Sequence, residues 1–161
     1  MLPTTASISL RPLVPEDEAF LFDLFSSDRG DDLAKLEWPA DRVVDFLSQQ
    51  YSAQQRFFRA DYPHADQFIV LRAAEPIGTI VVARDEREIR VVDIALMPPY
   101  RNAGIGTYLI KELLAEAGRL GRVFRVQVMR SNPAVGLFER LGLVRTGETG
   151  SHYQMEWSTA L

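Results

Sequence analysis

Short apolar segments, several of them alternating with polar residues, predict that much of this chain forms β-strands. In the middle of the sequence the first two of three such segments flank Glu75-Pro76, and Asp85-Glu86-Arg87 lies between the second segment and the third. Connections this short predict an antiparallel meander. The segments expected to form strands are Ile8–Arg11, Phe68–Leu71, Ile77–Ala83, Ile89–Leu96, Phe124–Met129 and His152–Trp157.

Apolar residues spaced three or four positions apart predict helices between these strands. One helix follows Pro15, and a second begins at Asp41, whose side chain suits an N-cap. The acidic stretch Asp28–Asp32 between them predicts a solvated loop, because it lacks the alternating ligands of a calcium site. The residues expected to face the core are Leu21, Leu24 and Phe25 in the first helix and Val43, Phe46, Leu47 and Tyr51 in the second.

The chain is organised around a strand, a turn and a helix in residues 91–118. Two prolines end the strand, and a turn containing Gly104 and Gly106 leads directly into an amphipathic helix. These glycines let the backbone approach a ligand closely, and the free N–H groups of the first helical turn attract an anion. The turn therefore predicts a binding site for a pyrophosphate.

Two common phosphate-binding motifs do not match this turn. A dinucleotide fingerprint requires a third glycine three residues after Gly106, where the chain has Leu109, and an acidic residue about twenty residues further on. A Walker loop requires a lysine before its serine or threonine, but Thr107 follows Gly106 directly. Neither motif explains the site.

The order of the predicted elements indicates an α+β fold. After the alternating strand 124–129, Asn132 is a suitable cap for a helix that has Pro133 in its first turn and ends at Gly142. This order predicts a mixed, mostly antiparallel central sheet with helices on both faces. A length of 161 residues, of which 47% are hydrophobic, suits one domain spanning residues 1–161.

Composition narrows the classes of function. The chain has no cysteine and two histidines, which excludes thiolate chemistry and predicts that it binds no metal. A formal net charge of -4 argues against nucleic acid as a partner and agrees with a cationic amine. Because no apolar run is long enough to cross a bilayer and the N-terminus lacks a signal pattern, we expect a cytoplasmic protein with no membrane partner.

The glycine turn and a later block together resemble the GNAT superfamily of N-acetyltransferases, in its bacterial stand-alone form. Arg101-x-x-Gly104-x-Gly106 is similar to the family's acyl-CoA signature, and residues 132–143 resemble its Asn-x-Ala-x-x-Leu-Tyr-Glu-x-Leu-Gly-Phe block. The resemblance implies that acetyl-CoA binds where the central strand splays from the 123–129 strand, and that a main-chain N–H near Leu96 polarises the thioester carbonyl. The residues that it implies for cofactor binding are Ala95, Leu96, Met97, Arg101, Asn102, Ala103, Gly104, Ile105, Gly106, Thr107, Asn132 and Phe138.

The chain departs from the family at two catalytic positions. Gln127 stands near where related N-terminal acetyltransferases carry a glutamate, and Phe138 stands where the family has a tyrosine acid. The remaining catalytic candidates are Asp93, which interrupts an apolar strand, and Tyr153 on the last strand. For Asp93, a simple hydrogen bond to a neighbouring loop is the alternative. Weaker candidates are Glu88 and His152.

The segment Gln54–His64 is both aromatic and polar. Aromatic faces receive cationic amines well, and the family places this region over the mouth of the substrate site. Phe57, Phe58 and Tyr62 are therefore predicted to bind the acceptor substrate, with an ordinary packed connection as the alternative.

The leading hypothesis is an acetyltransferase that moves an acetyl group from acetyl-CoA to a primary amine of a small molecule or peptide. The resemblance implies direct attack by the amine in a ternary complex, with acetyl-CoA as co-substrate and no metal. The alternative is a catalytically weak acyl-CoA-binding sensor or partner module. We expect a monomer or a homodimer.

Overall fold

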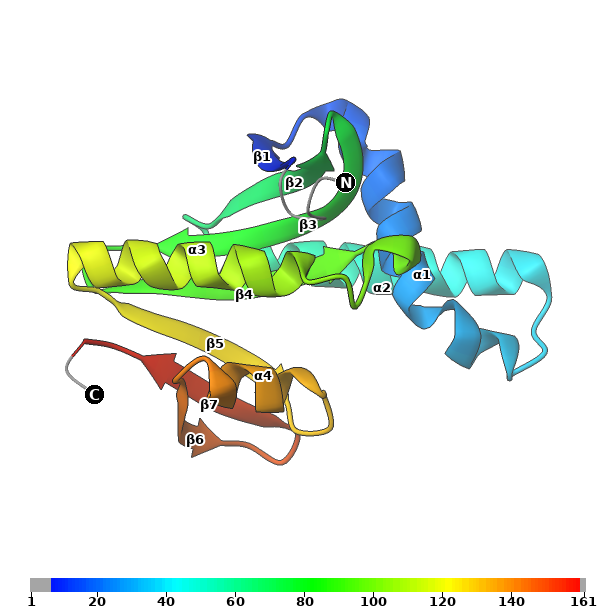
Figure 1. Ribbon diagram of the computed structural model, residues 1–161. Helices are drawn as coiled ribbons and strands as arrows, with labels where there is room; N and C mark the ends of the chain where they lie inside the picture. The colour runs from blue at the N-terminus through cyan, green and yellow to red at the C-terminus, as the bar shows by residue number, and fades with distance from the viewer. Residues whose placement is uncertain (1–6, 160–161) are drawn as a thin grey trace.

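A computed structural model describes residues 7–159 of the chain (Figure 1). Within this range the fold is α+β, as predicted, and a seven-stranded sheet has the order β1-β2-β3-β4-β5-β7-β6. Only β4 and β5 pair in parallel among these strands. The strands are β1 (Ile8–Pro12), β2 (Asp66–Arg72), β3 (Glu75–Arg84), β4 (Glu88–Leu96), β5 (Val123–Met129), β6 (Val144–Glu148) and β7 (His152–Trp157). The helices are η1 (Pro15–Asp17), α1 (Glu18–Ala34), α2 (Ala40–Asp61), η2 (Pro98–Tyr100), α3 (Ile105–Leu120) and α4 (Ala134–Arg140).

The sheet separates two apolar cores. Successive side chains of a strand point to opposite faces, so on β2 Ile69 packs with α1 and α2 whereas Val70 belongs to the core beneath α3 and α4. Figure 1 shows α3 lying along its face of the sheet. The larger core includes Ile80, Ile89, Ile105, Leu109, Phe124, Phe138 and Met155.

The predicted loop at Asp28–Asp32 is wrong, because α1 continues through it to Ala34. Leu33, which is buried, gives this part of the helix an apolar contact with the α1–α2 core. A run of acidic residues therefore need not end a helix that tertiary packing stabilises. Gly30 is tolerated inside the helix at a cost of about 1 kcal/mol relative to alanine.

Helix α2 differs from the prediction at both ends. Its N-cap residue is Pro39, not Asp41, which lies in the first turn and accepts a hydrogen bond from the N–H of Arg42 at 3.0 Å. A carboxylate there is favourable beside the positive end of the helix. At the other end α2 runs on to Asp61, so most of the segment Gln54–His64 is helical.

Strand β6 was not predicted from the sequence. All of its residues are exposed, so Val144–Glu148 lacks the alternation that marks a half-buried strand. It forms at the edge of the sheet by pairing with β7. A strand held mainly by its main-chain pairing leaves little signal in the sequence.

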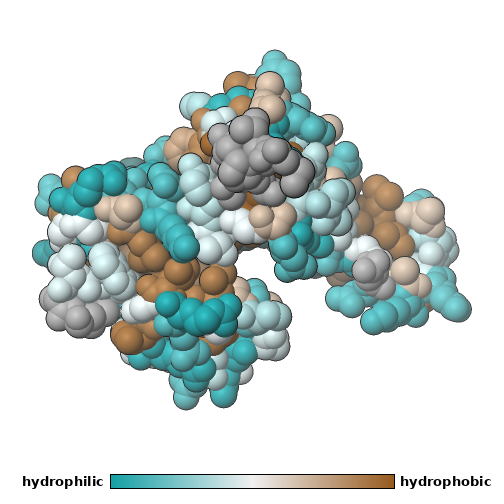
Figure 2. Space-filling view, viewed as in Figure 1, coloured by the Kyte–Doolittle hydropathy of each residue, from teal (hydrophilic) through white to brown (hydrophobic). Residues whose placement is uncertain are grey.

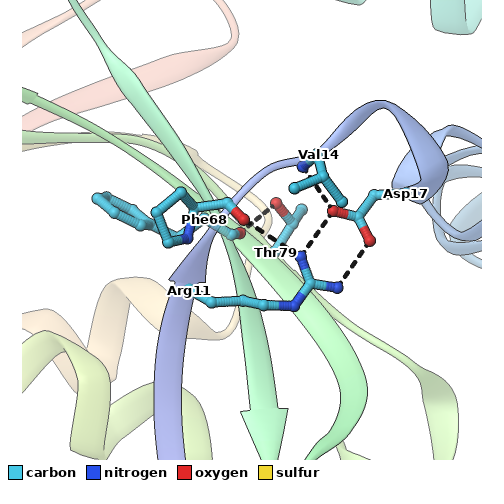
Figure 3. Close-up of polar contacts among 6 residues, drawn as sticks. Arg11, Val14, Asp17, Phe68 and Thr79 are labelled. Carbon is cyan, nitrogen blue, oxygen red and sulfur yellow. Dashed lines mark hydrogen bonds and ion pairs between the residues drawn. The ribbon is translucent and has the colours of Figure 1, made fainter.

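An ion pair anchors the start of α1 to β1 (Figure 3). The Arg11 guanidinium donates two hydrogen bonds of 2.8 Å to the Asp17 carboxylate, and the Val14 N–H donates a third at 2.9 Å. These bonds, Arg11 foremost, lower the pKa of Asp17 from 3.8 to about 2. The bidentate contact fixes the direction in which α1 leaves the sheet.

No helix in residues 7–159 combines the length and the apolar character needed to cross a bilayer. In the same residues, no three histidine, aspartate or glutamate side chains gather where they could hold a metal ion.

Candidate active site

A β-bulge in β4 turns Asp93 away from the core beneath α3. Val81 pairs with Asp93 and Val82 pairs with Val91, so Val92 is an extra residue in β4. An extra residue reverses the alternation of side chains between the two faces. Val91 therefore packs beneath α3, whereas Asp93 faces the side covered by α1.

Strands β4 and β5 separate after the bulge begins. Their parallel pairing joins Glu88–Val91 to Val123–Val126 and then stops, which confirms the predicted splay. The separation leaves a cleft of about 270 Å³ between the two strands. Figure 2 shows hydrophobic surface gathered in the hollow between α3 and α4. Residues that line the cleft include Asp93, Gln127, Asn132, Phe138 and His152.

The main chain of Leu96 faces the gap between these strands. The Met97 N–H donates a hydrogen bond of 2.8 Å to the Ile77 carbonyl, and the next pair along is Gly78 with Leu96. Hydrogen-bonded and non-hydrogen-bonded pairs alternate in an antiparallel ladder, so the polar groups of Leu96 point away from β3. Its carbonyl accepts a hydrogen bond of 2.8 Å from Arg101 Nε, which leaves the N–H for a ligand.

Helix α3 begins with an open N-terminus. Gly104 is its N-cap residue and has φ 86°, a left-handed conformation that favours glycine. No side chain in the described residues caps this end, and the N–H groups of a first helical turn have no partner within the helix. A Cβ built on Gly106 meets no atom within 4 Å, so the space beside the turn is free. Because Ile105 is fully buried, only its main chain can contact a ligand.

The side chain of Arg101 points back into the protein. Besides the Leu96 carbonyl, the guanidinium donates to Ser27 Oγ at 3.2 Å and forms an ion pair with Asp28 on α1. The predicted role of Arg101 in cofactor binding is therefore left to its main chain, which leads into the turn before α3.

A smaller pocket of about 60 Å³, here called the α1 pocket, lies beneath α1 and α2 on the other side of β4. Its apolar wall comes from α1, and its polar groups come from both helices and from β2, β3 and β4. Asp93 lines this pocket as well as the cleft. The apolar residues are Leu21, Leu24 and Phe25, and the polar ones include Asp28, Arg29, Tyr51, Gln54, Gln55, Gln67 and Thr79.

Two polar side chains of the α1 pocket, those of Thr79 and Tyr51, are buried. Thr79 donates a hydrogen bond of 2.8 Å to the Phe68 carbonyl (Figure 3). It also accepts one of 3.2 Å from Gln67. Tyr51 is only 7% exposed, and its hydroxyl makes no hydrogen bond. Burial, reinforced by the charge of Glu18, raises the pKa of Tyr51. An unpaired buried hydroxyl costs free energy unless a ligand or water satisfies it.

The environment of Asp93 makes it a suitable base. Burial raises the pKa of its carboxyl from 3.8 to about 6, and the charge of Asp28 acts in the same direction. Arg29 and the N–H of Ile94 oppose the shift. A carboxylate with a pKa near the working pH is effective in proton transfer.

Tyr153 is not among the residues that line the cleft, and its catalytic role stays a prediction. It packs against the core beneath α3 and α4, and its ring lies 4.1 Å from the guanidinium of Arg145 and 5.2 Å from that of Arg130. The neighbouring His152 does line the cleft. Glu88 also lies apart, because it forms ion pairs with Arg90 and Arg125 near the start of β4.

The predicted acceptor residues lie outside the α1 pocket. Phe57 is 51% exposed, and its ring centre is 6.1 Å from that of Phe58 and 6.3 Å from that of Tyr62. Tyr62 borders a different surface hollow near the β3–β4 turn. The structure brings the preceding turn of α2 to the pocket instead, through Gln54 and Gln55.

Part of the polar side of the α1 pocket was not predicted from the sequence. A signal existed for Thr79, which is 4% exposed and interrupts an apolar strand in the same way as Asp93. Gln54 and Gln55 belong to the segment Gln54–His64 that was predicted to lie at the acceptor site, but the prediction singled out its aromatic residues, because glutamine is common on any solvated helix surface. Only the packing of α2 against the sheet identifies them.

Comparisons with known proteins agree with this geometry. The sequence model of the Acetyltransferase (GNAT) family matches residues 30–143. No curated protein matches the chain. Among solved structures, the PaiA N-acetyltransferase from Thermoplasma acidophilum in complex with coenzyme A is 19% identical, with 94% of this chain and 99% of that chain covered and a TM-score of 0.67.

Two further solved structures share the fold. An acetyltransferase from Thermus thermophilus is 18% identical, covers 96% of this chain and 99% of its own, and has a TM-score of 0.65. A GNAT family acetyltransferase from Elizabethkingia anophelis with acetyl-CoA bound is 16% identical, with 95% of this chain and 99% of that chain covered and a TM-score of 0.61. Because the family match spans more than half of the sequence and includes the turn before α3, this chain belongs to the GNAT family of acetyltransferases.

Proposed function

We propose that this protein transfers an acetyl group from acetyl-CoA to a primary amine of a small molecule or peptide, by direct attack in a ternary complex. The observation that carries the proposal is the position of Asp93, which lines both the β4–β5 cleft and the α1 pocket. A donor held in the cleft and an acceptor held in the pocket would meet at this residue.

Acetyl-CoA fits the cleft side of the site. The open N–H groups at the start of α3 suit its pyrophosphate, and Gly106 leaves room for it. Asn132 and Phe138 border the cleft where the pantetheine arm would lie. The Leu96 N–H would donate to the thioester carbonyl, and one such donor contributes about 3–4 kcal/mol to transition-state stabilisation.

The α1 pocket favours a slender amine. Its volume of about 60 Å³ suits a group of a few heavy atoms, such as an aminoalkyl chain. Asp28 and Asp93 attract a cationic amine, and the side-chain oxygens of Gln54 and Gln55 can accept hydrogen bonds from it. Holding the two reactants in line lowers the barrier by up to about 7–11 kcal/mol.

The amine must lose a proton before it attacks. At pH 7 this costs about 4–5 kcal/mol for a lysine-like amine and about 1 kcal/mol for an α-amine. Asp93, with a pKa of about 6, is the base that we assign to this step. Phe138 has no proton to give, so the leaving thiolate, with a thiol pKa of about 8.5, takes its proton from water.

The test is thiol release from acetyl-CoA over a panel of small primary amines, diamines, amino acids and short peptides. We expect release with at least one class and a large loss in Asp93→Asn. The second candidate function is an acyl-CoA-binding sensor or partner module, which Gln127 and Phe138 favour because neither can transfer a proton. Tight binding of CoA without release for any amine would support that function instead.

A further inference from the structure

Arg101 connects two parts of the site that are distant in the sequence. It lies between η2 and α3, and its Nε donates to the Leu96 carbonyl at the end of β4. Its Nη2 donates to Ser27 Oγ and forms an ion pair with Asp28, both on the helix that covers the α1 pocket. One guanidinium therefore joins the cleft strand, the turn before α3 and the wall of the α1 pocket.

This arrangement is unfavourable for binding a phosphate. To reach a pyrophosphate at the N-terminus of α3, the guanidinium would have to give up the Leu96 carbonyl and leave Asp28 without its cation. Because the Asp28 side chain is 39% exposed, the ion pair alone contributes little to stability. The hydrogen bond to the Leu96 carbonyl also fixes the orientation of the Arg101 side chain, because a planar guanidinium holds its donors in a fixed fork.

We propose that Arg101 is a positioning residue that clamps the end of β4 to α1, and that it is not a ligand of the pyrophosphate. The proposal rests on the proposed function, since it assigns the two sides of the clamp to acetyl-CoA and to the acceptor amine. The clamp holds the Leu96 N–H toward the cleft and keeps α1 over the α1 pocket.

The clamp also sets the charge around Asp93. The groups that face Asp93 are Asp28 and Arg29 from α1, the neutral Tyr51 from α2, and His152 from β7 across the cleft. Asp28 raises the pKa of Asp93, and Arg101 counters Asp28 through their ion pair. Removing Arg101 should therefore move the titration of Asp93 to higher pH.

The experiment compares Arg101→Met, Asp28→Asn and the double variant with the wild-type protein. The Asp93 carboxyl is titrated by carbon NMR, and CoA affinity is measured by calorimetry at two salt concentrations. We expect the Asp93 midpoint to rise by several tenths of a pH unit in Arg101→Met and to fall in Asp28→Asn. In the double variant, the loss of Arg101 should change the Asp93 midpoint much less than it does in the wild-type background, because Arg101 and Asp28 act as a unit.

The two roles give opposite results for CoA. A positioning role leaves the Kd for CoA within about threefold of wild type in Arg101→Met, whereas loss of a phosphate ligand raises it about tenfold or more and weakens its salt dependence. A raised Kd with an unchanged Asp93 midpoint would overturn the proposal. Neither measurement needs turnover, so a protein that binds no CoA at all would refute the proposed function while the titration still tests the clamp.

A second variant covers the case in which Arg101→Met fails to fold. Arg101→Lys keeps a cation near Asp28 but lacks the Nε donor to the Leu96 carbonyl. We expect an unchanged Asp93 midpoint and a kcat reduced by about tenfold, with the KM for acetyl-CoA nearly constant. A lysine variant with wild-type kcat would show that the contact with Leu96 does not position the strand.

Discussion

Replacing Asp93 with asparagine should make the protein more stable and less active. The pKa of this carboxyl is raised from 3.8 to about 6, chiefly by burial. A shift of about two units disfavours the ionised form in the folded state by about 3 kcal/mol. Asparagine has nearly the same shape and no charge, so the variant avoids this penalty.

The gain in stability must depend on pH. Because the folded-state pKa lies above the unfolded-state value, the penalty is absent below about pH 4, grows between about pH 4 and pH 6, and is complete above that range. The free energy of unfolding of Asp93→Asn should therefore exceed that of the wild type by up to about 3 kcal/mol at about pH 8. At about pH 3.5 the two proteins should be equally stable.

Urea unfolding at both pH values measures the stability, and kcat/KM between about pH 5 and pH 9 measures the activity. In the wild type, kcat/KM should rise with pH through about 6 as Asp93 becomes ionised. The variant should lose this rise and about 10²–10⁴-fold in rate. Asp45→Asn is a matched control, because it removes one negative charge from an exposed position of α2.

Two results would refute this reasoning. A variant less stable than the wild type at about pH 8 would mean that the ionised carboxylate makes favourable contacts that outweigh its burial. A kcat/KM profile that still rises through about pH 6 in Asp93→Asn would assign the titration to another group, such as His152, which also lines the cleft.

Three further predictions concern the cleft, the leaving group and the N-terminal end of α1. Gly106→Asp should abolish CoA binding, as measured by calorimetry, and leave the fold intact, because a Cβ at this position meets no atom within 4 Å but the added negative charge repels the pyrophosphate. Gly106→Asn is the control of equal size. Unchanged affinity for CoA in the aspartate variant would mean that the phosphates bind elsewhere. Phe138→Tyr should raise kcat at saturating substrates by at most about 10²-fold, with little change in the KM for acetyl-CoA, because it restores an acid beside the cleft. A clear loss of kcat would show instead that the site requires an apolar ring. Asp17→Asn should lower the free energy of unfolding by about 1–2 kcal/mol at neutral pH. Because the folded-state pKa of Asp17 is lowered to about 2, this difference in stability between wild type and variant should shrink as the pH falls from about 4 toward 2. A difference that persists in urea unfolding at about pH 2 would assign the loss to packing.

Local chemistry was enough to predict the parts of the site that depend on neighbouring residues in the chain. Gly104 takes a left-handed conformation, and the helix after it starts with unpaired N–H groups, because both properties follow from a few consecutive residues. The same holds for the alternation in β5 and for the meander of β2, β3 and β4, although its first turn lies at Ala73 and Ala74, and Glu75 and Pro76 belong to β3. The sequence by itself therefore determined the fold class, the family and the local geometry of the turn before α3.

Only the tertiary structure decided which side chains meet. The bulge at Val92 is a property of the pairing between β3 and β4, and one extra residue is enough to send Asp93 to the opposite face from Val91. Gly78 shows the same dependence, because a Cβ there would clash with the Ala95 carbonyl oxygen of the paired strand. The contact between Arg101 and Asp28 spans 73 positions of sequence. Contacts of this kind depend on register and on the packing of helices against the sheet, and no local pattern of residues records them.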